Sequence, residues 1–375
     1  MAKKFFLSSI LIVFLFALFP SCKTDLPLPP VGSEPDSLFV GTPYVITAPQ
    51  FGFPPISIPP DNPMTVEGIQ LGRLLFYDPT LSSDSMFSCS SCHKQEFAFA
   101  DGGKVLSQNI FGLTKRNTPP LFNLVWMKKY FWDGRAGSLP QQANDALIHE
   151  QNFIASQSIA RLSAKPEYVS LFKKAFGRPG DITQQKIEKS IAQFMMTLIS
   201  SESKFDSVQR GQMSFSPAEL HGFNLFLTDT PNHGADCFHC HADNSAGTSF
   251  TMIDNGFHNN GLDAANSFTD FPDLGLGGFN GNMLDNGKFK TPHLRNVEVT
   301  GPYMRNGRFV TLEQVVNFYN DSLKTSPTID PFMKTAYRGG LRYLSEQDKQ
   351  DLIAFLKTLT DHRFLTNPDF STPFH

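Results

Sequence analysis

Two copies of one short cysteine motif constrain this chain more than any other feature of its sequence. The chain has five cysteines, and four of them fall in pairs of the pattern Cys-x-x-Cys followed directly by histidine. The two motifs consist of Cys89, Cys92 and His93, and of Cys237, Cys240 and His241. The fifth cysteine, Cys22, lies near the N-terminus, so the two motifs account for every other thiol.

Several kinds of chemistry use cysteines at this spacing. In an exported protein four cysteines would ordinarily form two disulfides, and zinc sites and redox-active dithiols share the Cys-x-x-Cys pattern. None of these requires the following histidine, and zinc ligands normally cluster more closely in sequence. Covalent haem c requires it, because two thioethers hold the vinyl groups while the adjacent imidazole reaches the iron. The motifs therefore predict two covalent haem c groups, with His93 and His241 as iron ligands.

The N-terminal segment predicts export. Lys3 and Lys4 precede an apolar run over residues 5–19, which is short for a membrane span and leads to Ser21 and Cys22. This pattern fits a signal peptide over residues 1–21 of the lipoprotein type, with a lipid anchor at Cys22; a retained N-terminal anchor helix is the alternative. Residues 22–61 carry many prolines and little helical periodicity, which predicts a flexible tether. We therefore expect a periplasmic, membrane-anchored lipoprotein.

Composition bounds the globular part. The chain has 375 residues, of which 40% are hydrophobic, enough for two ordinary domains. Its 32 Lys and Arg against 35 Asp and Glu leave a net charge of −3, which lacks the basic field that nucleic-acid binding needs. With 37 Phe, 27 Gly and 27 Pro, the chain is expected to combine aromatic packing with long loops. Nucleic acid is therefore excluded as a partner.

Around the cysteine motifs the pattern is helical. Capping boxes at Ser216, Thr311 and Ser345 each precede apolar residues at helical spacing, and another apolar stripe runs over residues 187–198. Strand patterns are scarce. Short helices that hold a haem through a cysteine loop are how small cytochrome c domains are built. The sequence thus predicts an all-α fold of two cytochrome c-like domains, each with one covalent haem c, and long Gly/Pro-rich loops.

Further stretches make the resemblance specific. The chain resembles the bacterial di-haem cytochrome c peroxidase family, which also includes the MauG-type enzymes. Besides the two haem motifs, the matching stretches are residues 71–78, 115–119, 131–135, 290–296 and 301–304, in the family's order. On this basis we expect a peroxidatic haem domain over residues 62–205, joined by the C-terminal helix 345–362, and an electron-transfer haem domain over residues 206–344.

The resemblance implies different roles for the two haems. The N-terminal haem resembles the one at which hydrogen peroxide binds, and the C-terminal haem the one that receives electrons. Trp132 falls where the family places a tryptophan between the haems; a buried packing aromatic is the alternative reading of this residue. Asn117, Thr300 and Pro302 match positions that hold one Ca²⁺ through oxygen ligands, although loop shaping alone would also account for the asparagine and the proline.

The pocket expected at the first haem departs from the family pattern. Many members carry a distal histidine in the loop that corresponds to residues 107–113, which here contains none. The sixth iron position is therefore expected to hold water or nothing, and peroxide is expected to react without prior reduction. Asn152 stands where the family has a catalytic glutamate. Glu150 is the candidate replacement, a solvated loop acid being the alternative, and Gln142 matches a family pocket residue.

The second haem's sixth ligand is expected to be Tyr319. It lies on the apolar face of the helix that starts at about Leu312, at the position where the family's peroxidases carry an axial methionine and MauG-type enzymes carry tyrosine. A phenolate ligand should lower the reduction potential of the iron. A hydrogen-bonded core tyrosine is the alternative, with Met304 or Met283 then the next ligands to test. His258 and His293 could line the second haem.

Together these features predict a cytochrome-c peroxidase-type enzyme that reduces hydrogen peroxide with electrons from a small donor protein, a cytochrome c or a cupredoxin. Two alternatives stay open. One is a MauG-type enzyme that oxidises side chains of a partner protein, and the other is a di-haem electron carrier without catalysis. The sequence also leaves a homodimer open.

Overall fold

The computed structural model describes residues 41–47, 49, 52–103, 106–177, 180–229, 232–242, 252–334 and 343–374. The expected signal peptide, the expected lipid anchor at Cys22 and the first part of the tether lie outside these residues. Within the described ranges, no helix is long and apolar enough to cross a membrane.

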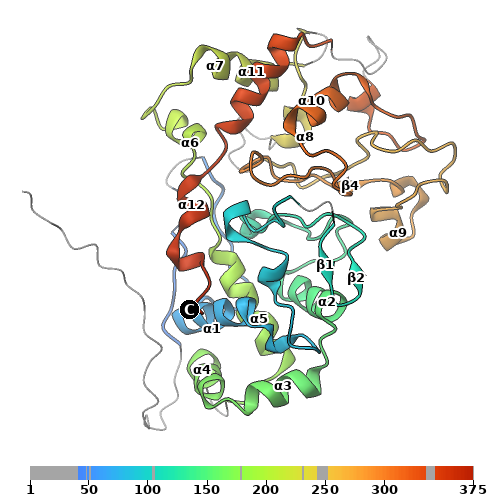
Figure 1. Cartoon of the computed structure of the whole chain (residues 1–375). Coiled ribbons are helices and arrows are strands. Elements are labelled where there is room, and N and C mark those ends of the chain that lie inside the picture. Colours follow the sequence, from blue (N-terminus) through green and yellow to red (C-terminus); the bar gives the residue numbers. More distant parts are fainter. Residues whose placement is uncertain are drawn as a thin grey trace, which may run out of the picture. The chain divides into compact units, whose positions relative to one another are not determined.

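Helices make up most of the regular structure (Figure 1). They are α1 (Val66–Tyr77), α2 (Leu139–Gln151), α3 (Ala155–Ser163), α4 (Pro166–Phe176), α5 (Gln184–Thr197), α6 (Lys204–Gln209), α7 (Pro217–Leu227), α8 (Phe238–His241), α9 (Leu276–Asn280), α10 (Leu312–Asp321), α11 (Glu346–Lys357) and α12 (His362–Thr366). Short 3₁₀ turns lie between them, among them η2 (Cys89–Ser91), η4 (Leu124–Trp126) and η6 (Met283–Asp285).

The strands are very short. β1 (Gln108–Asn109) pairs antiparallel with β2 (Gly112–Leu113), and β3 (Phe257–His258) pairs antiparallel with β4 (Phe289–Lys290). In the second pair Phe257 lies opposite Lys290. The prediction of a mostly helical chain with little sheet is confirmed in these residues.

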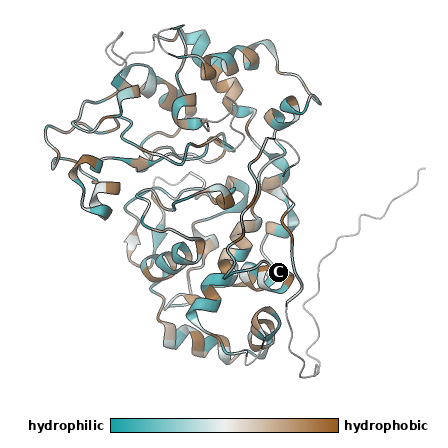
Figure 2. Cartoon of the chain, turned by 180° about the vertical axis from the view of Figure 1, so that it is seen from behind, coloured by the Kyte–Doolittle hydropathy of each residue, from teal (hydrophilic) through white to brown (hydrophobic). Residues whose placement is uncertain are grey.

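The helices begin where the capping signals predict. Ser216 is the N-cap of α7, and its hydroxyl accepts from the backbone N–H of Glu219, whose carboxylate in turn accepts from the backbone N–H of Ser216 at 2.7 Å. Thr311 before α10 and Ser345 before α11 form the same box. In Figure 2 the helices carry hydrophobic and hydrophilic residues side by side, as expected of helices that bury one face.

The first hydrophobic core lies between α1 and α5. Phe76 of α1 and Phe194 of α5 are buried and their ring centroids lie 5.3 Å apart. The two helices approach closely at Gly72, where a Cβ atom would lie 1.9 Å from the carbonyl oxygen of Ser190. Any side chain at Gly72 would push the helices apart, which explains the glycine at this position.

The second core lies between α7 and α11. It includes α11, which the expected domain division assigned to the first domain. Helix α11 buries Leu352 and Phe355 against α7, with the rings of Phe226 and Phe355 5.3 Å apart (Figure 1). The expectation that the helix over residues 345–362 joins the first domain is wrong for α11; only the following α12 returns, placing Phe364 in the first core. The apolar stripe identified the buried face of α11 but not the helix it packs on.

The last part of the expected tether contacts the globule. Phe53 packs on Trp126 with ring centroids 4.9 Å apart, and the guanidinium of Arg295 lies 4.8 Å from the Phe53 ring. Arg295 is fully buried and pairs with the buried Asp206 of α6. The first contacts with the folded part therefore occur before residue 62.

Candidate functional site

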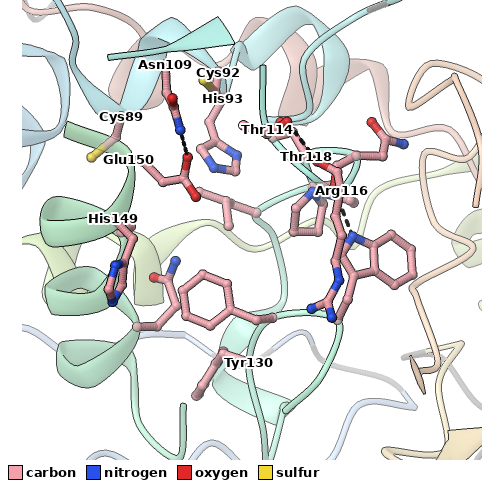
Figure 3. Close-up of a pocket in the computed structure, with 18 of the residues that line it drawn as sticks. Cys89, Cys92, His93, Asn109, Thr114, Arg116, Thr118, Tyr130, His149 and Glu150 are labelled. Atoms are coloured by element: carbon pink, nitrogen blue, oxygen red, sulfur yellow. Dashed lines mark hydrogen bonds between the residues drawn. The ribbon is translucent and has the colours of Figure 1, made fainter. Parts of the chain in front are cut away.

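The first cysteine motif lines a large cavity. Cys89 and Cys92 bracket the turn η2, and together with His93 they line a cavity of about 1090 Å³ (Figure 3). This exceeds the range of about 300–1,000 Å³ typical of sites for small organic ligands. The cavity is therefore large enough for a macrocycle attached at both thiols.

His93 is held in the tautomer that a metal ligand needs. Its Nδ1 lies 2.6 Å from the carbonyl oxygen of Phe99, to which it donates, so Nε2 is left for a metal. Burial lowers the pKa of His93 to about 4, so the ring is neutral at physiological pH. The residues of the first motif thus fit a haem whose iron is bound by His93.

Polar side chains from two separate segments line the same cavity as His93. Asn109 of β1 donates from Nδ2 to a carboxylate oxygen of Glu150 in the last turn of α2, and both residues line the cavity (Figure 3). Gln142, nearer the N-terminus of α2, also lines the cavity. Within the described structure its buried Oε1 has no hydrogen-bond partner. His149 lies on the cavity wall beside them.

Asn152 does not belong to this wall. It caps the C-terminus of α2 in the left-handed conformation, with φ of 49°, and its Nδ2 donates to the hydroxyl of Ser83 at 3.2 Å. The residue at the family's glutamate position thus faces another segment, whereas Glu150 faces the cavity.

The second cysteine motif lines a second, smaller cavity. Cys237, Cys240 and His241 lie on and beside the short helix α8 and border a space of about 190 Å³. Burial lowers the pKa of His241 to about 4, which keeps this imidazole neutral as well. The donor set of two thiols and a neutral imidazole is the same as at the first motif, and it fits a second covalent haem.

Tyr319 lies in the wall of the second cavity, as predicted from its place on α10. Its hydroxyl oxygen accepts from Nδ2 of Asn260 at 2.9 Å, and the same amide nitrogen lies 3.6 Å from the sulfur of Met304. Met333, which the sequence reading did not consider, also lines this cavity. Met283 is 60% exposed in η6 and is absent from both cavity walls in the described structure.

Trp132 belongs to the walls of both cavities. Its indole Nε1 donates to the carbonyl oxygen of Asn117 at 2.8 Å, which fixes the ring at the boundary between them. His293 also lines both cavities, and its ring lies 5.0 Å from that of Phe122. The expected position of Trp132 between two cofactor sites therefore agrees with the arrangement of the cavities.

The residues expected to bind calcium lie together. Asn117, Thr300 and Pro302 all line the second cavity, and Nδ2 of Asn117 donates to the carbonyl oxygen of Pro302 at 2.5 Å. Rotating this amide by half a turn would place its oxygen beside the same carbonyl, the arrangement that a hard cation requires. The described part of the chain has no cluster of three or more His, Cys, Asp or Glu that could hold a metal ion.

His258 is a charged member of the second wall. Its Nε2 lies 2.7 Å from Asp254 and its Nδ1 lies 2.6 Å from Asp330. Burial alone would lower the pKa of His258, but the two carboxylates outweigh it and raise the pKa to about 9. Both ring nitrogens are thus engaged, which leaves this histidine without a free nitrogen for iron.

Comparison with known proteins agrees with the two sites. The family model described as di-haem cytochrome c peroxidase matches residues 66–214. The methylamine utilization protein MauG of Methylorubrum extorquens is 35% identical over 309 residues, which are 80% of this chain and 80% of the relative. The cytochrome-c peroxidase IdrP1 of a Pseudomonas species is 31% identical over 351 residues, covering 85% of this chain and 88% of the relative.

A solved structure extends the similarity to the fold. The crystal structure of a MauG-like protein associated with microbial copper homeostasis matches 88% of this chain and 100% of its own, with a TM-score of 0.77 and 32% identity. The two cysteine motifs, the two cavities that share Trp132 and these matches lead to one conclusion. This chain is a member of the di-haem cytochrome c peroxidase/MauG family and a cytochrome-c peroxidase family oxidoreductase.

Proposed function

We propose that the protein is a periplasmic di-haem peroxidase that reduces hydrogen peroxide to water with electrons from a small redox protein. One hydrogen peroxide, two electrons and two protons give two water molecules. The observation that carries this proposal is the first cavity, which is lined by the neutral His93 and by the polar side chains of Asn109, Gln142 and Glu150. A haem bound there would supply the iron at which the O–O bond is cleaved.

The loop over residues 107–113 sets the access of peroxide. It contributes Asn109, Phe111 and Leu113 to the cavity wall, and none of these side chains is a strong iron ligand. Family members with a histidine in this loop must release it before peroxide binds. The loop over residues 107–113 has no histidine to release, so a haem bound here would be open to peroxide in the fully oxidised protein.

Glu150 is the proposed proton carrier of this pocket. Cleavage of peroxide is faster when a side chain moves a proton from the near to the far oxygen, and a carboxylate does this. The amide of Asn109 holds the Glu150 carboxylate at the cavity wall. The unpartnered Oε1 of Gln142 provides an acceptor for a peroxide O–H.

Electrons are proposed to enter at the second haem and to pass through Trp132. The indole lines both cavities and its N–H is held by Asn117, so the ring is a fixed aromatic bridge between the two sites. The donor is expected to be a cytochrome c or a cupredoxin.

A second function is favoured by one specific observation. The second cavity presents Tyr319 where family peroxidases carry methionine, and MauG is among the relatives with the highest identity reported above. With Tyr319 as iron ligand, the second haem would have a low potential and would suit storage of an oxidising equivalent. The corresponding activity is oxidation of side chains on a partner protein with peroxide as oxidant.

Calcium, the lipid anchor and export complete the proposal. One Ca²⁺ bound by Asn117, Thr300 and Pro302 would connect the loops at the boundary of the two cavities. Treatment with a calcium chelator should then alter the spectrum of the second haem, and added Ca²⁺ should restore it.

Acylation of Cys22 is tested by mass spectrometry of the mature protein, and an unmodified mature N-terminus elsewhere would contradict it.

The decisive experiment adds peroxide to the oxidised protein, with haem content measured first by the pyridine haemochrome assay. We expect two covalent haems per chain and spectral changes without prior reduction. Multiple turnover with a reduced small cytochrome c or cupredoxin supports the peroxidase. Reaction with peroxide but no turnover with either donor favours the MauG-type activity, and no reaction with peroxide leaves an electron carrier.

A further inference from the structure

Lys290 is a buried lysine at the boundary of the two cavities. It belongs to β4, is 8% exposed and lines both cavities. Its backbone N–H donates to the main-chain carbonyl oxygen of Trp132 at 2.8 Å, so β4 is tied to the backbone of the residue whose side chain lines both cavities. Neither the proposed peroxide chemistry nor the proposed iron ligands use its side chain.

The other lysine and arginine side chains in the two walls are already neutralised or solvated. They are Lys115, Arg116, Arg135 and Arg305. Arg116 and Arg135 pair with Asp133 at 2.6 and 3.2 Å, and Arg305 pairs with Asp263. Lys115 is exposed to solvent. Each of these cations is thus either paired with a carboxylate or hydrated by solvent.

Lys290 has neither. Its Nζ donates to the carbonyl oxygen of Thr291 at 3.3 Å, and no carboxylate oxygen in the described part of the chain lies within 4 Å of it. Burial lowers the pKa of Lys290 to about 8, and the more distant Asp254 only partly opposes this. Burying an ammonium group without an anionic partner costs free energy, so an anion bound beside Lys290 would stabilise its charged form.

A covalent haem brings that anion. Its vinyl groups are used by the cysteines and its iron by the histidine, but its two propionate carboxylates remain free to bind cations. We propose that Lys290 is the binding residue for a haem propionate carboxylate at the boundary between the two cavities. This inference rests on the proposed loading of both sites with haem.

The consequence is electrostatic. An ammonium beside a propionate removes negative charge near the iron, and this stabilises the reduced haem and raises its potential. Lys290 thereby sets the potential of a haem without touching its iron. It is a positioning residue for the cofactor and not a catalytic residue.

The test compares Lys290→Gln, which removes the charge, with Lys290→Arg, which keeps it. The matched control is Lys173→Gln, the same change on an exposed lysine of α4 that lies outside both cavity walls. Haem content is measured first, and the potentials of both haems are then measured by spectroelectrochemistry. We expect Lys290→Gln to lower the potential of at least one haem, and Lys290→Arg and Lys173→Gln to match the wild type.

A Lys290→Gln protein with two haems and unchanged potentials would overturn the proposal. If Lys290→Gln does not retain haem, resonance Raman spectra of Lys290→Arg decide, because the propionate bending band responds to the identity of its hydrogen-bond donor. A shift of this band in Lys290→Arg supports the proposal, and an unchanged band overturns it. These measurements need no turnover. A protein that does not react with peroxide would therefore refute the proposed function but not the proposed role of Lys290.

Discussion

Replacing Glu150 by glutamine removes the proposed proton carrier while preserving the shape of its side chain. Asn109 donates to the Glu150 carboxylate, and a glutamine oxygen accepts the same hydrogen bond, so the pocket should keep its geometry. General acid–base catalysis contributes about 10²- to 10⁴-fold, which corresponds to about 2.7–5.5 kcal/mol of barrier. We therefore expect the second-order rate of the oxidised protein with peroxide to fall by about 10²-fold or more in stopped-flow measurements.

Two further variants separate proton transfer from packing. Asn109→Ala removes the donor that positions the carboxylate and should cause a smaller loss than Glu150→Gln. Glu167→Gln changes an exposed acid of α4 outside both cavity walls and should leave the rate unchanged. A Glu150→Gln protein that carries two haems and reacts at the wild-type rate would refute the assigned role.

Three other predictions concern the second haem and the stability of the fold. Tyr319→Met should raise the reduction potential of the second haem markedly; a Tyr319→Phe protein with unchanged potential and spectrum would show that the ligand lies elsewhere. Asp206→Ala should lower the free energy of unfolding in urea by about 3–5 kcal/mol, because it removes the carboxylate from a buried ion pair with Arg295; a loss below about 1 kcal/mol, typical of a surface pair, would contradict this. The pKa of His258 is raised from 6.5 to about 9, so its ion pairs should stabilise the protein fully below pH 6.5 and lose this effect as the pH rises through 9. Thermal unfolding of wild type and His258→Gln from pH 6 to 10 should therefore converge, and a constant difference would argue against these ion pairs.

Local signals in the sequence predicted much of the fold. The capping boxes at Ser216, Thr311 and Ser345 predicted the starts of three helices, because the hydrogen bonds that begin a helix lie within four residues. The position of Tyr319 on the cavity side of α10 followed from helical periodicity in the same way. Features with a short range in sequence were thus within reach of pattern reasoning.

Contacts between segments that are distant in the sequence could not be predicted from such local patterns. The apolar stripe of α11 predicts a buried face, but packing on α7 depends on the close approach at Gly222, where a Cβ would lie 1.9 Å from the carbonyl oxygen of Asp351. The contact of Asn109 with Glu150 joins a hairpin to a helix end, and no spacing rule connects them. Lys290 stood within a matched stretch, but only its burial distinguishes it from a solvated lysine.

The most direct test of the central claim is an electron paramagnetic resonance spectrum of the oxidised protein with two bound haems, before and after peroxide. An open first site opposite His93 and a ligated second site predict one high-spin and one low-spin ferric signal. The high-spin signal should disappear on adding peroxide without any reductant. Two low-spin signals that stay unchanged by peroxide until the protein is reduced would contradict the account.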